Sequence, residues 1–349
     1  MLFKKKKLIG LDVGASAIKL AELDNVKKAP HLVSFGMAPT PKESSGAKEV
    51  FPQEQLAEAI RNLVKEVKTK RRRVATAIWD SSVIVKKISI LKADESLIEE
   101  QIRYEAEQYI PHDINQVSLD FEILKSSDPQ SDTVDVLLVA AFEESALKCV
   151  ETITMAGLEC SVLDVKGFAL ANCFEVNYGA SQGQVVGLLN VGAHETSFVI
   201  FENGEIVFCR EVPVGGDTYT GDLQKVLGVS FEEAESLKIS LSEDAAAPEE
   251  AYKVVKSIHE IICDEISGTL DFFLNTSSAE SLDRCFITGG GARVPGFLEA
   301  MSKIAPCEEL DPFRKISFNK KIFSSEYIQQ IKPFSAVAIG LGLREEEKT

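Results

Sequence analysis

The sequence has little basic charge, no long apolar run and no closely spaced cysteines. Its 38 lysines and arginines are outnumbered by 54 aspartates and glutamates, giving a formal net charge of −16. Nucleic-acid binding depends on basic surface that releases counterions, so we expect no nucleic-acid partner. Apolar runs such as Val136–Phe142 are far shorter than the roughly 20 residues that span a bilayer. Asp12 interrupts the apolar stretch after the first lysines, which argues against a cleaved signal. We therefore expect a soluble, cytoplasmic protein.

The seven cysteines and four histidines are scattered along the chain. Their spacing suits neither metal ligation nor a disulfide framework. Reduced, mostly buried thiols in a cytosolic protein are the simplest interpretation. The lysines at 4–7 are interpreted as a solvated leader, with weak contact to anionic lipid as the alternative.

The stretch Leu8–Leu23 combines two apolar runs around a turn with almost no side chains. Leu8–Val13 and Ile18–Leu23 are predicted as strands, and Gly14–Ala17 forms the turn between them. Backbone N–H groups at such a turn suit an anion, and the nearby carboxylate of Asp12 suits a hydrated cation. Taken alone, the stretch is better explained as an ordinary hairpin.

The opening pattern occurs a second time, which changes this interpretation. Within Gln184–Phe201, the segment Asn190–Ala193 aligns with Asp12–Ala15, and strand-like residues flank both. A third predicted strand follows each copy, at His31–Ala38 and at Glu205–Val212. The chain therefore contains two copies of a strand–glycine turn–strand–strand unit, one in each half.

The remaining periodicities predict a mixed α/β protein with two halves. Apolar spacing predicts helices at 53–68, 94–110 and 251–275. Further helices are expected at 143–156, 168–176, 218–227, 231–240 and 333–343, and strands at 74–79, 83–90, 117–124, 134–142, 159–164 and 285–288. The expected organisation is a first half at 1–180 with an inserted α+β subdomain at about 82–160, a second half at 181–332 with a helical subdomain at about 218–283, and a last helix and tail at 333–349. Gly157 is expected to end its helix in a left-handed C-cap.

A third glycine run, Gly289–Gly291, follows the strand at 285–288. Two glycine turns, one from each half, would hold a polyphosphate from two sides. A glycine run before a helix would let a ribose or base lie close to the backbone.

In order and spacing these motifs resemble those of the actin/hexokinase/Hsp70 superfamily. Residues 8–23 resemble its first phosphate motif, 187–201 its second and 286–296 its adenosine motif. Helices at 168–176 and 333–343 resemble the pair that connects its halves. Within the superfamily, the chain resembles the PilM family of type IV pilus assembly proteins, with the FtsA division proteins next. The implied fold is α/β: actin-like (ribonuclease H-like) duplicated domains with an α+β insert in the first half.

The resemblance implies ATP and Mg²⁺ as cofactors. Asp12 would hold Mg²⁺ through water, with Asn190 as a weak further contact. The implied phosphate contacts are the backbone N–H groups of Gly14, Ala15, Ser16, Ala17, Gly192, Ala193, His194 and Glu195. The implied nucleoside contacts are Glu235, Lys238, Gly289, Gly290 and Gly291. For Glu235 and Lys238 an ordinary solvated helix face is the alternative.

Two features indicate slow or no hydrolysis. The second phosphate motif usually has an aspartate where this chain has Asn190, and its loss removes a contact to the cation. Hydrolysis also needs a group that orients the attacking water. Asp164 is the nearest candidate, with Lys166 close by, and a helix cap or structural acid is the alternative role. We expect the nucleotide to act as a conformational clamp between the halves.

The resemblance also implies partners. The protein would dock on a short cytoplasmic N-terminal segment of PilN, a single-pass inner-membrane protein that recruits it to the membrane. The groove is expected between the first domain and its insert, lined by the helix at 94–110 and its flanking strands. Pilus motor ATPases and a second copy of the chain are the other implied partners.

Two alternative functions have the same fold. An FtsA-like, membrane-linked polymerising division protein would need a C-terminal amphipathic helix, whereas this sequence ends in a short polar tail. A small-molecule kinase would need a catalytic aspartate at an acceptor pocket, for which Asp164 is the one candidate.

Overall fold

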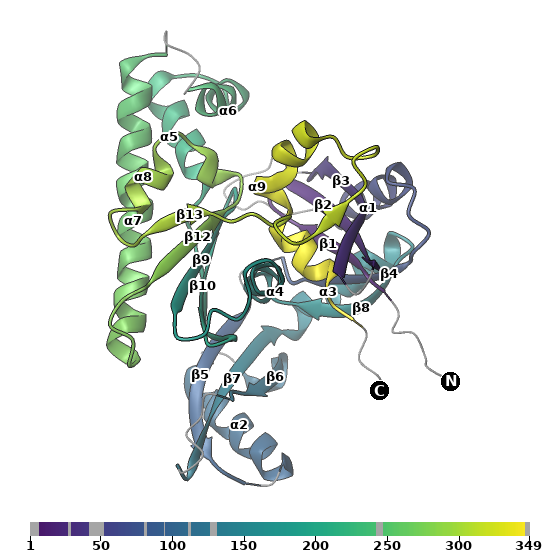
Figure 1. Cartoon of the computed structure of the whole chain (residues 1–349), viewed down its shortest axis with the longest axis vertical. Helices are drawn as coiled ribbons and strands as arrows, with labels where there is room; N and C mark the ends of the chain where they lie inside the picture. Colours follow the sequence, from purple (N-terminus) through teal and green to yellow (C-terminus); the bar gives the residue numbers. More distant parts are fainter. Residues whose placement is uncertain are drawn as a thin grey trace.

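The computed structural model describes residues 7–26, 29–41, 52–79, 82–93, 95–110, 113–125, 131–241 and 247–345. The lysines at 4–6 and the acidic tail at 346–349 lie outside this part of the chain. Two large sheets, each with its own helices, flank helix α4, and a smaller sheet projects from one end (Figure 1). Among the described residues, no helix is both long and apolar enough to cross a bilayer.

The first sheet contains the predicted hairpin at its centre. Its strands, in sheet order, are β14 (Ser317–Phe318), β3 (Ala29–Pro39), β2 (Ala17–Val26), β1 (Ile9–Val13), β4 (Arg73–Ala77) and β8 (Glu159–Asp164). Strand β1 is antiparallel to β2 and parallel to β4, which in turn is parallel to β8. Parallel strands end at the same edge of a sheet, so Asp12 and Asp164 lie near this edge.

Helices cover both faces of the first sheet. On one face α1 (Gln53–Glu66) and α3 (Glu143–Met155) pack their apolar residues against β1 and β2. On the other face α4 (Lys166–Tyr178) crosses α9 (Ser325–Gly342). This crossing requires small residues, because a Cβ atom on Gly340 would lie 1.7 Å from the carbonyl oxygen of Ala169.

The insert is a three-stranded antiparallel sheet with one helix. It contains β5 (Ile84–Leu91), α2 (Glu95–Tyr109), the short helix η1 (Ile114–Gln116), β6 (Val117–Ile123) and β7 (Thr133–Phe142), in the sheet order β5-β7-β6. Its own core joins Ile98 and Ile102 of α2 to the sheet. The unit ends at Phe142, earlier than the predicted 160, because Cys149 and Ile153 of α3 belong to the core of the first half.

The second sheet repeats the first. Its order is β11 (Glu205–Val212), β10 (Thr196–Glu202), β9 (Val185–Val191), β12 (Arg284–Thr288) and β13 (Cys307–Glu309). Strand β9 is antiparallel to β10 and parallel to β12, as β1 is to β2 and β4. The helices of this half are α5 (Gly216–Leu227), α6 (Phe231–Ser240), α7 (Glu249–Thr276), η2 (Gly291–Arg293) and α8 (Phe297–Met301).

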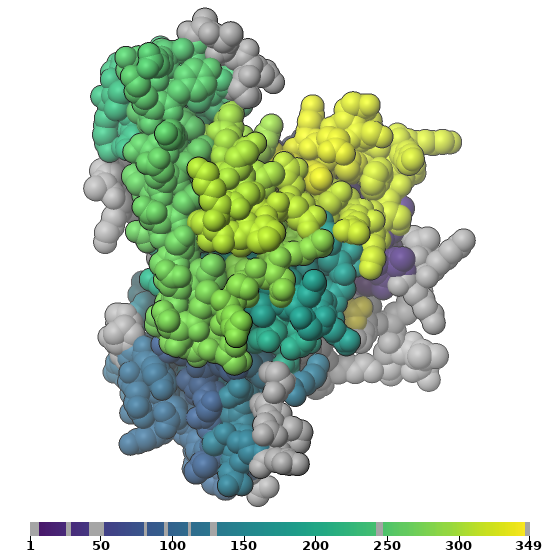
Figure 2. All heavy atoms as spheres, turned by 60° about the vertical axis from the view of Figure 1, so that its left-hand side comes forward, coloured from purple at the N-terminus to yellow at the C-terminus, as the bar shows by residue number. Residues whose placement is uncertain are grey.

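The insert lies against the second half as well as the first. Strand β5 lies beside β11, and the backbone N–H of Lys125 donates to Glu205 at 2.6 Å. In the space-filling view the blue insert projects beyond the green second half (Figure 2). The insert therefore contacts both halves of the molecule.

The connecting helix α9 begins earlier than predicted. Proline is costly inside a helix, so its position predicted a start at Pro333. Instead the helix begins at Ser325, where the Ser324 hydroxyl accepts from the Tyr327 N–H at 3.1 Å. The Pro333 carbonyl accepts from the Gly289 N–H at 2.9 Å, which joins α9 to the glycine run. The left-handed cap predicted at Gly157 is confirmed by its φ of 79°.

Candidate functional site

The turn between β1 and β2 leaves backbone N–H groups without protein acceptors. The Gly14 N–H donates to the Ala17 carbonyl at 3.1 Å. Thr40 binds the turn from the side: its hydroxyl donates to the Gly14 carbonyl at 2.6 Å and its N–H to the Ser16 carbonyl at 3.1 Å. Within the described part of the chain, the N–H groups of Ala15 and Ser16 have no acceptor. The predicted anion contact therefore has donors available at this turn.

The turn between β9 and β10 has the same closure. The Gly192 N–H donates to the Glu195 carbonyl at 2.9 Å. The start of α5 lies directly against this turn, with the Gly216 N–H donating to the Gly192 carbonyl at 2.9 Å. A Cβ atom on Gly215 would lie 2.7 Å from the carbonyl oxygens of Gly192 and Ala193. This role of Gly215 was not predicted, although the pair of glycines at 215 and 216 was an available signal.

The Gly289–Gly291 loop packs on the second turn. Gly289 has a φ of 99°, and a Cβ atom there would lie 2.2 Å from the carbonyl oxygen of Val191. A Cβ atom on Gly291 would lie 2.7 Å from the Val191 side chain. Two of the three glycines thus let the loop lie against the end of β9. Their predicted contact with a nucleoside stays a prediction.

Asp12 lies at the end of β1, opposite Lys19 of β2 in the strand register. The Lys19 ammonium is 3.1 Å from the Asp12 carboxylate. It also lies over the turn, because a Cβ atom on Gly14 would be 2.8 Å from the Lys19 Nζ. Lys19 therefore brings a positive charge to the turn with free N–H groups, which sequence reasoning missed. Its register with Asp12 was the signal that would have revealed it.

The second copy has a neutral pair at the equivalent place. Asn190 of β9 stands opposite Ser197 of β10, where the first copy has Asp12 opposite Lys19. Across the described residues, no group of three or more histidine, cysteine or acidic side chains converges as a metal site. The predicted contact of Asp12 with Mg²⁺ through water, and the weak one of Asn190, stay predictions.

A cluster of partly buried charges joins the two halves behind the turns. Lys166, the first residue of α4, places its ammonium 2.5 Å from the Glu195 carboxylate. Burial disfavours the ammonium form, but Glu195, Glu211 and Asp12 together raise the pKa of Lys166. The Ser197 hydroxyl donates to the Glu211 carboxylate at 2.8 Å. Burial, reinforced by the charge of Glu195, raises the pKa of Glu211 to about 7.

Asp164 is held by an arginine. Arg344 donates to its two oxygens from Nε at 2.6 Å and from Nη2 at 2.8 Å. The Val165 N–H donates to the same carboxylate at 2.8 Å. These contacts support the structural alternative for Asp164, and its catalytic role stays a prediction.

Glu235 and Lys238 join α6 to the start of α5. Lys238 is 7% exposed, so it does not belong to a solvated helix face. Its ammonium is 2.6 Å from the Glu235 carboxylate and 3.2 Å from the Gly216 carbonyl. The Thr220 hydroxyl also donates to Glu235, at 2.6 Å. The pair thus positions the helix that lies against the second turn, while its contact with a nucleoside stays a prediction.

Two sheets with the same strand arrangement, each with a glycine turn between its first two strands, define the actin-like ATPase class of protein. One solved structure of this fold is the ethanolamine utilization protein EutJ from Carboxydothermus hydrogenoformans. It aligns with a TM-score of 0.55 and 17% identity, over 97% of this chain and 89% of that one. More narrowly, the chain belongs to the family described as type IV pilus assembly protein PilM, which matches residues 10–346.

Further relatives lie on the same branch. A chain in the solved PilM-PilN type IV pilus biogenesis complex is 29% identical, with a TM-score of 0.88, over 99% of this chain and all of that one. The cell division protein FtsA of Bacillus subtilis (strain 168) is 26% identical over 218 residues, which are 56% of this chain and 45% of the relative. FtsA of Enterococcus hirae is 25% identical over 177 residues, 39% of its length. The chain thus spans less than half the length of these two curated relatives.

Proposed function

We propose that this protein is an ATP-binding scaffold of type IV pilus assembly that docks on the cytoplasmic N-terminal segment of a PilN-like inner-membrane protein. The observation that carries the proposal is its full-length similarity to a chain of the PilM-PilN complex. The FtsA-like alternative is supported only by partial matches. Recruitment by PilN would bring the protein to the inner membrane, where contacts with pilus motors and self-association are further expectations.

The first turn would supply the donors and the positive charge that a nucleoside triphosphate needs. The free N–H groups of Ala15 and Ser16 would bind phosphate oxygens, and the Lys19 ammonium would balance their charge. Asp12 would hold a hydrated Mg²⁺. The Glu195 carboxylate would repel phosphate, but its ion pair with Lys166 offsets that repulsion.

The surroundings of Asp164 and Asn190 support slow or no hydrolysis of ATP. Asp164 is engaged by Arg344, and Asn190 offers an amide in place of a carboxylate. Neither is arranged as a base for an attacking water. Bound nucleotide would then hold the halves together and change the surface that the insert shares with them.

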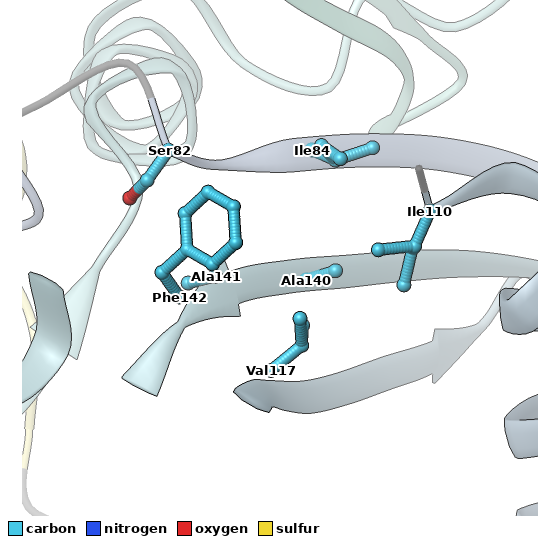
Figure 3. A pocket seen from close by; sticks show the side chains of 7 residues that line it. All are labelled: Ser82, Ile84, Ile110, Val117, Ala140, Ala141 and Phe142. Atoms are coloured by element: carbon cyan, nitrogen blue, oxygen red, sulfur yellow. The ribbon is translucent and has the colours of Figure 1, made fainter. Parts of the chain in front are cut away.

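The insert offers an apolar place for the PilN-like segment. A small pocket opens between the insert strands at their end nearest the first half, lined by Ser82, Ile84, Ile110, Val117, Ala140, Ala141 and Phe142 (Figure 3). On α2, Leu97 and Tyr104 are 50% and 70% exposed. They are seven residues apart and therefore share a helix face. The pocket has room for only about one water, so we infer that the segment binds along this exposed face of α2.

The test is a titration of the full-length protein with the N-terminal cytoplasmic peptide of its cognate PilN. Tyr104→Ala should weaken peptide binding about tenfold, in the range of a central aromatic contact. Ile322→Ala is the matched control, because Ile322 is 65% exposed and far from the insert along the chain. Equal affinities for Tyr104→Ala and wild type would show that α2 does not line the groove. Failure of the wild type to bind the peptide would contradict the docking proposal itself.

A further inference from the structure

Two of the seven cysteines lie side by side at the edge of the second sheet. Cys285 of β12 and Cys307 of β13 are direct partners in the parallel register. Neighbouring strands are about 4.8 Å apart, which falls within the roughly 4.4–6.8 Å that a disulfide spans between Cα atoms. Register partners project from the same face of a sheet, so the two thiols meet.

The two thiols are chemically unequal. The side-chain contact with Cys285 lowers the pKa of Cys307, whose own Sγ donates to the Ala305 carbonyl at 3.1 Å. The same thiol pair and burial raise the pKa of Cys285, which is 1% exposed. Cys307 is only partly buried and lies on the edge strand β13. A partly exposed thiol with a lowered pKa next to a buried one is the arrangement of an attacking and a resolving cysteine.

The other cysteines lack this combination. Burial raises the pKa of Cys160 to about 11 and that of Cys209 well above its ordinary value. Cys263 of α7 lies near Cys307, but burial raises its pKa too, and its Sγ contacts the Met301 sulfur at 3.5 Å. Among the described thiols with a shifted pKa, only that of Cys307 is lowered.

We propose that Cys285 and Cys307 form a reversible redox pair that responds to peroxide. The Cys307 thiolate attacks a peroxide oxygen, the O–O bond breaks, and Cys307 becomes a sulfenic acid while hydroxide leaves. The Cys285 sulfur then attacks the Cys307 sulfur, the S–O bond breaks, and water leaves as the Cys285 proton is taken up. Two thiols are oxidised to one disulfide and hydrogen peroxide is reduced to two waters. A small-molecule dithiol reverses the step.

The disulfide would act on the strand that leads to the glycine loop. Cys285 lies three residues before Thr288, whose hydroxyl donates to the Pro333 carbonyl at 3.2 Å. Directly after β13, the Leu310 N–H already donates to the Ile287 carbonyl of β12 at 2.8 Å. A covalent bond at the other end of the β12–β13 pair would fix β13 along its whole length.

The experiment uses the reduced, full-length protein with hydrogen peroxide as the oxidant. After quenching, the thiols are alkylated in denaturant and mapped by peptide mass spectrometry. In the wild type, Cys285 and Cys307 should lose alkylation together and regain it after dithiothreitol. Cys285→Ser should stop at a sulfenic acid on Cys307, trapped by dimedone. Cys263→Ser, the matched control for a neighbouring thiol, should behave as the wild type.

Three results would overturn the proposal. The first is that Cys285 and Cys307 remain fully alkylated in the wild type at peroxide concentrations that oxidise other thiols of the chain. The second is a disulfide between Cys307 and Cys263. The third is a dimedone adduct on Cys285 in Cys307→Ser, which would assign the attacking role to the wrong thiol. Wild-type mapping alone distinguishes the first two, so the test does not depend on a variant that folds.

Discussion

Replacing Glu211 by glutamine should make the protein more stable above neutral pH. The carboxyl is partly buried beside Glu195 and Lys166, and its pKa is about 7 instead of the ordinary 4.5. Because the pKa is higher in the folded state, the folded protein binds more protons than the unfolded chain between these values. The contribution of Glu211 to stability is therefore fully present below pH 4.5 and is lost as pH rises through 7. Glutamine keeps the shape and an oxygen for the Ser197 hydroxyl but cannot ionise.

The magnitude follows from the two pKa values. At 1.36 kcal/mol for each pKa unit, the whole loss is about 3 kcal/mol. The part of this loss of unfolding free energy that falls between pH 5.5 and 8.5 is about 2 kcal/mol. The advantage of Glu211→Gln over the wild type should grow by this amount across that range. At pH 5.5, where Glu211 is mostly protonated, the two proteins should differ by no more than about 1 kcal/mol.

Urea denaturation at a series of pH values measures this difference directly. The unfolding free energies of wild type and Glu211→Gln are compared from pH 5.5 to 8.5, with the m-value as a check on the transition. Glu260→Gln, an exposed change on α7, is the control and should run parallel to the wild type. If the unfolding free energies of wild type and Glu211→Gln change in parallel with pH, ionisation of Glu211 does not destabilise the folded protein and the reasoning is refuted.

Three further predictions concern the turns and their supports. Lys19→Gln should weaken ATP binding about tenfold or more, since an ammonium–phosphate hydrogen bond is worth about 1.5–3 kcal/mol. If a fluorescent ATP analogue binds the variant and the wild type equally well, Lys19 does not contact the nucleotide. Gly289→Ala should cost at least about 1–3 kcal/mol of unfolding free energy, because its φ is 99° and a Cβ would meet the Val191 carbonyl. Gly221→Ala in α5 has open space and should instead stabilise by about 0.5–1 kcal/mol, so equal effects in urea would contradict the packing argument. Arg344→Ala should cost about 2 kcal/mol of unfolding free energy, because it leaves the buried Asp164 carboxylate without its positive partner. Adding Asp164→Asn should recover part of this loss in thermal unfolding, whereas an additive loss would argue against the ion pair.

Local patterns were enough to predict most of the elements. The glycine turn at Gly14 and its copy at Gly192 both connect antiparallel strands, because two short apolar runs separated by a glycine turn are typical of a β-hairpin. The insert was also predicted from local patterns, and the connecting helices from the family resemblance. What the sequence left undecided was which surface an amphipathic helix covers. For α3, the apolar residues Cys149 and Ile153 fit either the insert or the first half, and only the packing decides.

Side-chain partners far apart in the sequence could not be predicted. Lys166 and Glu195 are 29 residues apart, and Arg344 is 180 residues from Asp164. The first contact joins the start of α4 to the turn between β9 and β10, and the second joins the end of α9 to the end of β8. The start of α9 was also missed, because the helix continues through Pro333, whose carbonyl accepts from the Gly289 N–H.

The most direct test of the central claim is to measure the affinity of the PilN-like peptide with and without Mg-ATP. If nucleotide clamps the halves against the insert, peptide and nucleotide must change each other's affinity by the same factor. We predict that saturating Mg-ATP shifts the peptide Kd by at least about fivefold, with the reciprocal shift in the ATP Kd when peptide is saturating. A peptide that binds with one Kd under both conditions would contradict the clamp, and a peptide that binds under neither would contradict the scaffold.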